Sequence, residues 1–197
     1  MDKIAVIPAR AGSKRLPKKN YKSFNSRTLV EIARDKCLTA GIFDKVIISS
    51  DDPFFEQLVN CNQVEFLKRS ENLAGDDATT DMVIDFFFEE LPFCDSILWV
   101  NSVSPLQSIQ DIKNCGTRLS DPQVDCVMAI NTLYQHSCIG NKPLNFDPNS
   151  PFEKTQDLEP IQRYIYSCMG WKKKTYVNHR KSGFKGLFPG KMELVEK

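Results

Sequence analysis

Short apolar runs alternate along the first two-thirds of the chain with segments of helical periodicity, and this alternation constrains the fold more than any other feature. Strands joined through helices form right-handed crossovers and pair in parallel. The sequence therefore predicts an α/β fold of three layers, Rossmann-like, with a mostly parallel sheet. The apolar runs are Lys3–Pro8, Lys45–Ser49, Val64–Leu67, Asp95–Val100 and Asp125–Ile130. The segments with helical spacing are Thr28–Ala40, Pro53–Asn60, Thr79–Leu91 and Ser108–Leu119.

The whole chain, residues 1–197, is expected to form a single domain, because its length falls within the usual domain size. After Asn131 the pattern changes. The segment Cys138–Pro160 is rich in Pro, Asn and Asp, and Tyr164–Val177 is aromatic and suited to extended structure. Residues 138–177 therefore predict an irregular insertion or a β-arm, whereas the tail Gly183–Lys197 shows no helical period.

Charge and cysteine usage exclude several classes of protein. The 26 Lys and Arg residues nearly balance the 25 Asp and Glu residues, so no bulk field is expected to hold nucleic acid or an anionic membrane. The start Met1–Pro8 is too short for the core of a signal peptide, and no apolar run is long enough for a membrane span. The nearest cysteines, Cys115 and Cys126, are eleven positions apart, so no zinc or thioredoxin motif is present. A cytoplasmic protein with reduced thiols is expected.

The loop that follows the first predicted strand, Ala9–Asn20, carries the most chemical information. Gly12 permits close approach of the backbone to a ligand, and consecutive N–H groups in such loops bind anions. Arg10 offers a planar fork to phosphate oxygens, Lys19 a compact charge and Ser13 a hydroxyl donor. The P-loop and Rossmann glycine patterns are both absent. The alternative is a solvated basic loop, which is the commoner fate of Lys/Arg runs.

Three polar segments follow predicted strands: Ala9–Asn20, Lys68–Thr80 and Asn101–Gln107. In an open parallel sheet, ligands bind beyond the carboxyl ends of the strands. We therefore expect these segments to share one rim of the sheet and to form the binding site there.

The segment Ile7–Asn20 resembles the signature of the acylneuraminate cytidylyltransferases, I-P-A-R-x-G-S-K-R-[L/I]-P-x-K-N, at every fixed position. Ile48–Asp52, Arg69–Thr80 and Asn101–Gln107 resemble, in order, the family segments V-S-T-D-D, R-P-x-x-L-A-x-D-x-A-x-[ST] and Q-P-T-S-P-L-R. The resemblance is strong to about Gln107 and looser beyond it.

This resemblance implies a nucleotidyltransferase fold with a dimerisation insertion, and a homodimer. It implies transfer of CMP from CTP to a nine-carbon, sialic-type sugar acid, with Mg²⁺ as cofactor and pyrophosphate as the second product. Arg10 and Lys19 would act in catalysis, and Asn101 and Ser104 would contact the sugar. The nucleotide-binding residues implied are Ala9, Arg10, Ser13, Lys19, Asn20, Arg69, Ala78 and Thr80.

The sequence departs from the family pattern in its carboxylates and in its sugar-binding segments. The family has a late D-I-D motif for the metal, but the chain has no D-x-D, and Gly190–Lys197 stands about where that motif would begin. We therefore assign no metal ligands and expect these residues to bind CTP far better than they turn it over. Asn101 replaces a family Gln, Ser102-Val103 replace Pro-Thr, and Lys154-Thr155 replace an Arg.

Two alternatives stay open: a catalytically impaired nucleotide-binding protein with a regulatory or subunit role, and a cytidylyltransferase for another sugar acid such as an octulosonate. The segment Ser102–Leu106 argues against the second.

Several other residues are expected to have structural roles. Asp51 or Asp52 should cap a helix or turn, as should Asp77 or Thr79, although Asp76-Asp77 share a loop with Arg69. Core packing is expected for Phe86–Phe88 and Trp99, solvation for Lys172–Lys174, and no catalytic role for His136 or His179.

Overall fold

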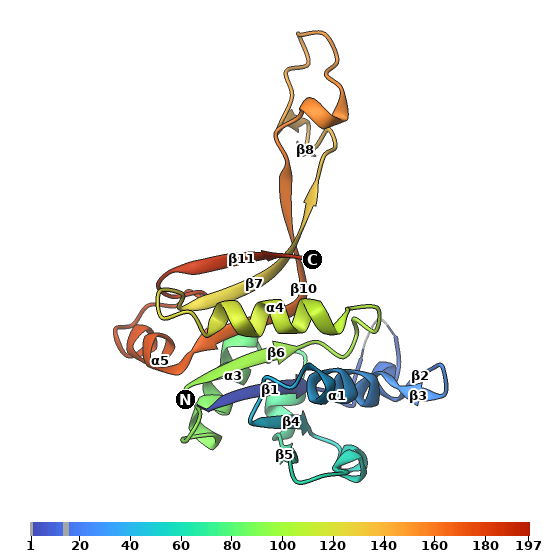
Figure 1. The fold of residues 1–197 in the computed structure, drawn as a ribbon, viewed down its shortest axis with the longest axis vertical. Coiled ribbons are helices and arrows are strands. Elements are labelled where there is room, and N and C mark those ends of the chain that lie inside the picture. The colour runs from blue at the N-terminus through green and yellow to red at the C-terminus, as the bar shows by residue number, and fades with distance from the viewer. Residues whose placement is uncertain (1, 14–15) are drawn as a thin grey trace.

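The computed structural model describes residues 2–13 and 16–197, and seven strands within these ranges form one sheet in the order β11-β7-β10-β6-β1-β4-β5 (Figure 1). All neighbouring pairs are parallel except those of β10, which runs antiparallel to both β6 and β7. The predicted α/β class with a mostly parallel sheet is confirmed. The strands are β1 Lys3–Pro8, β4 Lys45–Ser50, β5 Val64–Lys68, β6 Ser96–Val100, β7 Cys126–Leu133, β10 Ile161–Lys172 and β11 Met192–Glu196.

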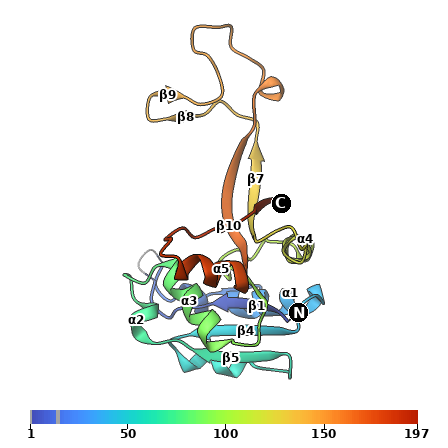
Figure 2. The same cartoon turned by 90° about the vertical axis from the view of Figure 1, so that its left-hand side faces the viewer.

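Helices cover both faces of this sheet, α1 and α4 on one side and α3 and α5 on the other (Figure 2). Helices α1 and α4 each begin at a capping box. Thr28 and Glu31 form a reciprocal capping box at the start of α1, and Gly41 ends that helix in the left-handed conformation. The helices are α1 Leu29–Ala40, α2 Glu71–Ala74, α3 Thr80–Glu90, α4 Ile109–Leu119 and α5 Lys173–Lys181, with 3-10 turns η1 Lys19–Tyr21, η2 Pro53–Leu58 and η3 Thr155–Asp157.

Alternate residues of the central strands pack into two separate cores. In β1, Ala5 and Ile7 face the core beneath α1 and α4, whereas Ile4 and Val6 face the core beneath α3. All four side chains are at most 1% exposed. Burial on both faces explains why these strands appear in the sequence as continuous apolar runs. The sheet is therefore a rigid support for the loops that follow its strands.

The expectation of five strands is wrong in the second half of the chain. The antiparallel β10 enters the sheet between β7 and β6, and the tail contributes β11, which pairs with β7. Helix α5 replaces extended structure expected after residue 172. Strands β10 and β11 are placed by pairing with strands that are distant in the sequence. Helix α5 is largely polar and packs on the body through the buried Tyr176, so tertiary contacts rather than local periodicity stabilise it.

Strands β7 and β10 continue beyond the body as a two-stranded ribbon (Figures 1 and 2). The short strands β8 (Cys138–Ile139) and β9 (Lys142–Pro143) pair near the outer end of this arm. A second small hairpin, β2 (Ser23–Phe24) with β3 (Arg27–Thr28), precedes α1. Large apolar side chains of the arm are exposed, including Ile139 at 69% and Phe152 at 78%. The arm thus presents apolar surface far from the sheet.

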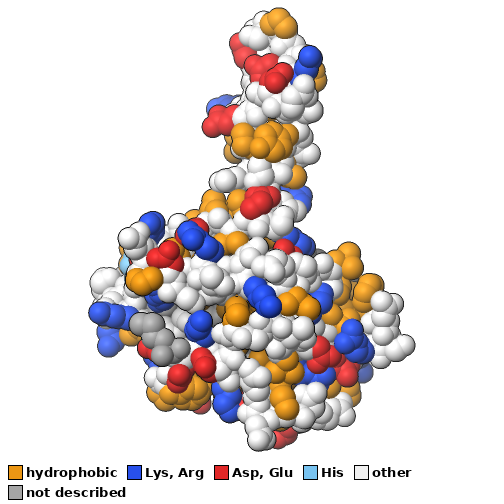
Figure 3. All heavy atoms as spheres, in the orientation of Figure 1, with side chains coloured by type: hydrophobic (Ala, Val, Ile, Leu, Met, Phe, Trp, Pro, Cys, Tyr) orange, Lys and Arg blue, Asp and Glu red, His pale blue; other side chains and the backbone are white. Residues whose placement is uncertain are grey.

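The surface carries interspersed charges of both signs over the face shown in Figure 3, rather than one basic patch. This distribution agrees with the near-zero net charge of the sequence. Among the described residues, none of the helices combines the length and apolar character needed to cross a bilayer.

The cysteines are all free, and five of them are buried: Cys37, Cys94, Cys115, Cys126 and Cys168.

The expectation of a solvated Lys172–Lys174 run is wrong for its first two members. The Lys172 ammonium donates to the Asp121 carbonyl, and that of Lys173 donates to the Leu91 carbonyl, because α5 packs against the loops that precede β6 and β7.

Candidate functional site

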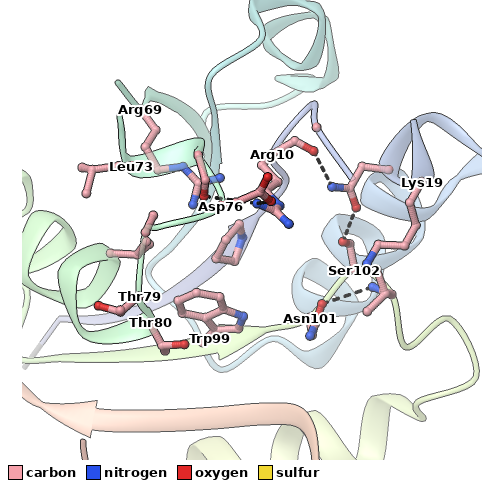
Figure 4. Close-up of a pocket in the computed structure, with 17 residues that line it drawn as sticks. Arg10, Lys19, Arg69, Leu73, Asp76, Thr79, Thr80, Trp99, Asn101 and Ser102 are labelled. Carbon is pink, nitrogen blue, oxygen red and sulfur yellow. Dashed lines mark hydrogen bonds and ion pairs between the residues drawn. The ribbon is translucent and has the colours of Figure 1, made fainter. Parts of the chain in front are cut away.

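A cavity of about 250 Å³ opens beyond the carboxyl ends of β1 and β6, and the loops after β1, β5 and β6 line it (Figure 4). These are the three segments that the sequence predicts at one rim. The described lining residues are Pro8, Arg10, Gly12, Lys19, Asn20, Arg69, Leu73, Gly75, Asp76, Ala78, Thr79, Thr80, Val83, Trp99, Asn101, Ser102 and Val103.

Arg10 is held at the cavity by the loop that follows β5. Its Nη1 donates to the carbonyl oxygens of Ala74, at 3.3 Å, and Gly75, at 3.2 Å, at the end of α2. The same nitrogen lies 3.2 Å from Asp76 Oδ1. The guanidinium thus stays at the cavity wall with nitrogen donors left over for an anion.

Arg69 provides a second, buried guanidinium at the cavity. The residue is only 4% exposed, and its Nε has no hydrogen-bond partner among the described residues. Burial lowers the pKa of this guanidinium, and the nearby Arg10 lowers it further, while Asp51 opposes both. A buried donor without a partner is costly, so this site favours an anionic ligand that accepts a hydrogen bond. Lys19, at the start of η1, adds a third cation to the lining.

Asn20 braces the loop after β1 against the loop after β6. Its Nδ2 donates to the Arg10 carbonyl at 2.9 Å, and its Oδ1 accepts from Ser102 Oγ at 2.8 Å. Both residues are buried, Asn20 at 5% and Ser102 at 1% exposed. Ser102, which stands where the resembling family has Pro, therefore takes part in a hydrogen bond that a proline could not make.

The carboxylates near the cavity have different tasks. Asp51 accepts from the Ala11 N–H at 2.9 Å, which shapes the loop, and Asp52 caps η2 and accepts from the Tyr21 hydroxyl. The expected capping role is confirmed for Asp52. The hydrogen bond from Tyr21 is the main reason that the pKa of Asp52 lies below its ordinary value.

These carboxylates do not form a ligand set for a resident divalent metal. Within residues 2–13 and 16–197 there is no cluster of three or more His, Cys, Asp or Glu side chains that could hold one. Of the described lining residues, Asp76 alone carries a carboxylate, and Arg10 contacts it. Mg²⁺ at a phosphate site normally takes one or two carboxylates together with substrate oxygens, so we assign no protein ligand set here.

Trp99 and Asn101 form the end of the cavity that adjoins β10. The expectation that Trp99 lies in the core is confirmed in part. The side chain packs against the core that contains Phe87, with the two rings 6.2 Å apart, and it also lines the cavity. The Asn101 N–H donates to the Ser167 carbonyl at 2.9 Å, and its Nδ2 donates to the Tyr166 carbonyl at 3.3 Å.

Tyr166 occupies a left-handed conformation, with φ of 53°. It lies where the register of β10 shifts, between Tyr164 and Met169. Such a conformation costs a non-glycine residue about 1–2 kcal/mol. Strain of this kind persists only where the surrounding structure enforces it, and it gathers at functional sites.

The structure brings most of the predicted site residues to one cavity. Arg10, Lys19, Asn20, Arg69, Ala78, Thr80 and Asn101 line it. Ala9 and Ser13 are not among the described lining residues, and neither is Ser104. Ala9 is buried, and its N–H donates to the Ser49 carbonyl. Lys14 and Arg15, which complete the loop motif, lie outside the described residues.

Other lining residues were not singled out from the sequence. Thr79 is expected only as a helix cap, and Leu73 and Val83 are apolar residues whose type does not distinguish a cavity wall from the core. The two histidines lie elsewhere, His136 stacked on Phe152 in the arm and His179 against Phe184.

Comparison with solved structures supports this fold. CMP:2-keto-3-deoxy-manno-octonic acid synthetase, solved in complex with CTP, matches with a TM-score of 0.70 at 14% identity, over 100% of this chain and 91% of that one. The bifunctional IspDF from Campylobacter jejuni matches with a TM-score of 0.69 at 14% identity, over 100% of this chain and 50% of that one. At these identities the likeness concerns the fold alone.

Sequence comparison is more specific. A pseudaminic acid cytidylyltransferase from Campylobacter jejuni is 36% identical over 170 residues, covering 84% of this chain and 63% of the relative. An N-acylneuraminate cytidylyltransferase from Streptococcus agalactiae is 26% identical over 189 residues, covering 91% of this chain and 46% of the relative. The chain thus spans roughly half to two-thirds of the length of these relatives. The Cytidylyltransferase family model matches residues 4–163, and the chain therefore belongs to the cytidylyltransferase family.

Proposed function

We propose that the protein transfers CMP from CTP to a nonulosonic, sialic-type sugar acid and releases pyrophosphate, as a step toward surface glycans. One observation carries the proposal: Arg10, Lys19 and Arg69 line a single cavity at the carboxyl ends of the strands, in a chain of the cytidylyltransferase family. The printed names of the relatives, which include a CMP-N,N'-diacetyllegionaminic acid synthase, support this class of acceptor without selecting one sugar.

In the proposed reaction, the sugar hydroxyl attacks the α-phosphorus of CTP. A new oxygen–phosphorus bond forms, the bond to the β-phosphate breaks, pyrophosphate leaves and the hydroxyl proton passes to solvent. Negative charge increases on the leaving oxygens, where fixed cations stabilise the transition state. We assign this role to Arg10 and Lys19, and binding of the triphosphate to Arg69.

The other nucleotide contacts follow from their positions on the cavity. Ala78 and Thr80, at the start of α3, would complete the nucleotide pocket, and Asn20 would hold the Arg10 loop in place. Ser13 would offer its hydroxyl to the triphosphate, and the buried Ala9 would support the loop from below. Asn101, and Ser104 after it, would contact the sugar. Mg²⁺ is expected as a counterion of the triphosphate, with no residue assigned to it.

We further propose that residues 1–197 act as one nucleotidyltransferase domain in the cytoplasm. Of the predicted insertion, residues 138–177, the part before the central sheet forms the arm, whereas residues 168–177 belong to the sheet and to α5. The arm would contact a second subunit in a homodimer. Its exposed apolar side chains support this, because apolar side chains gathered on a projecting surface mark protein–protein contacts. Light scattering at micromolar concentration tests it, and a mass of the monomer alone would contradict it.

A pyrophosphate-release assay tests the main proposal, with CTP, Mg²⁺ and a panel of sialic, pseudaminic, legionaminic and octulosonic acids. Release that depends on one nonulosonic acid is the expected result. Release with an octulosonic acid alone would move the assignment to the other sugar acid. Tight CTP binding without release would support the other candidate, a catalytically impaired nucleotide-binding protein.

A further inference from the structure

Tyr166 combines backbone strain with an exposed aromatic side chain at one point of the sheet. Its φ of 53° lies in the region where glycine is at ease and a tyrosine is not. The residue is 54% exposed, so burial of its ring does not compensate for this conformation in the free protein. The chain therefore keeps an unfavourable residue here without an evident gain in stability.

The position of Tyr166 connects it to the cavity. Its carbonyl oxygen accepts from Asn101 Nδ2 at 3.3 Å, and the next carbonyl, of Ser167, accepts from the Asn101 N–H at 2.9 Å. Asn101 itself lines the cavity. The ring of Tyr166 contacts that of Tyr164 edge to face, with centroids 6.3 Å apart. Tyr166 thus stands where β10 leaves the body toward the arm, beside the cavity end formed by Trp99 and Asn101.

We infer that Tyr166 is a specificity-determining residue that contacts the acceptor sugar acid. The inference rests on the proposed function. The cationic groups Arg10, Lys19 and Arg69 suit the triphosphate, which leaves the Asn101 end for the acceptor. The cavity is smaller than most ligand pockets, so a nucleotide and a nine-carbon sugar together must extend over its edge. An exposed tyrosine offers the sugar an apolar ring face and a hydroxyl.

Three variants separate this role from a structural one. Tyr166→Gly removes the ring and relieves the strain, and Tyr166→Phe removes the hydroxyl alone. Ser26→Gly is the matched control, because Ser26 also has a positive φ, of 63°, but lies in the turn between β2 and β3. The readouts are the melting temperature, the Kd of CTP by calorimetry, and kcat and KM for each acceptor by pyrophosphate release with saturating CTP and Mg²⁺.

We expect Tyr166→Gly and Ser26→Gly to melt no lower than the wild type. Tyr166→Gly should raise the acceptor KM by roughly tenfold or more, the usual effect of a lost apolar contact. The Kd of CTP should stay within about twofold, because the proposed triphosphate contacts, Arg10, Lys19 and Arg69, lie in the loops after β1 and β5 rather than on β10. Tyr166→Phe should keep most of the acceptor affinity, and Ser26→Gly should leave KM unchanged.

The failures are distinguishable. If the wild type neither binds CTP nor releases pyrophosphate with any acceptor, the proposed function fails and the role of Tyr166 fails with it. If the wild type is active and Tyr166→Gly leaves the acceptor KM unchanged, only the inference on Tyr166 is overturned. A change of oligomeric mass in Tyr166→Gly with an unchanged KM would also overturn it, and would assign the ring to a subunit contact.

Discussion

Arg10 Nη1 lies 3.2 Å from Asp76 Oδ1, so the loop after β1 and the loop before α3 meet through opposite charges at the wall of the cavity. Both side chains are partly exposed, at 38% and 44%. Asp76 therefore occupies one donor direction of Arg10 that a phosphate oxygen would use. An incoming triphosphate must share Arg10 with this carboxylate or displace it.

Asp76→Asn should raise the affinity for CTP measured without divalent metal, because it removes a competitor and a negative charge. An exposed ion pair is worth at most about 1 kcal/mol, which corresponds to a gain of about fivefold. Calorimetric titration measures it, with the neighbouring Asp77→Asn as control. A large loss of affinity seen only with Mg²⁺ would contradict this view and would give Asp76 a role in holding the metal.

Arg10→Ala and Lys19→Ala should each weaken CTP binding by roughly tenfold or more. A charge-assisted hydrogen bond lost from a partly buried site costs about 1.5–3 kcal/mol. The same titration measures it, and Lys22→Ala, an exposed residue after η1, is the control for loss of one positive charge. Unchanged affinity in both variants would remove this loop from the nucleotide site.

Ser102→Ala should destabilise the protein and loosen the site. The substitution leaves Asn20 Oδ1 buried without its 2.8 Å donor, at a cost of about 1–3 kcal/mol. Urea unfolding measures the free energy, with Ser104→Ala as the control outside the cavity lining. A stability equal to that of the wild type would show that this link does not brace the two loops.

Local sequence patterns predicted the first half of the fold and the rim of the sheet on which the cavity opens, and the family resemblance pointed to Arg69, Ala78, Thr80 and Asn101 in its lining. The capping box of Thr28 and Glu31, like the loop after the first strand, is formed by residues that are close in the sequence. The contacts that complete the site join residues far apart in the chain, such as Ser102 with Asn20 and Asn101 with Tyr166. These contacts depend on the antiparallel entry of β10 and on its register shift, which no periodicity encodes.

Asp125, just before β7, joins helix α5 and the tail through its side chain. Its Oδ1 accepts from Thr175 Oγ1 at 2.6 Å, and its Oδ2 accepts from the Lys191 N–H at 2.8 Å. Partial burial raises the pKa of this carboxyl, but the hydrogen bonds from Thr175 and Lys191, with the nearby Lys172, outweigh it, and the pKa lies below its ordinary value. Gly190, with φ of 69°, packs so closely that a Cβ there would collide with the carboxylate.

Asp125→Asn should therefore lower the melting temperature at pH 7, by about 2–4 °C for each kcal/mol lost in a chain of this size. Because the folded pKa is lowered, the carboxylate stabilises the fold above the unfolded pKa of about 4, and this contribution disappears as the pH falls through the folded pKa. The difference in melting temperature between wild type and variant should thus be largest at neutral pH and should shrink as the pH falls. Scanning calorimetry from pH 7 to pH 3 measures it, with the exposed arm residue Glu153→Gln as control. A difference that stayed constant over this range would mean that Asp125 acts through packing rather than through its charge.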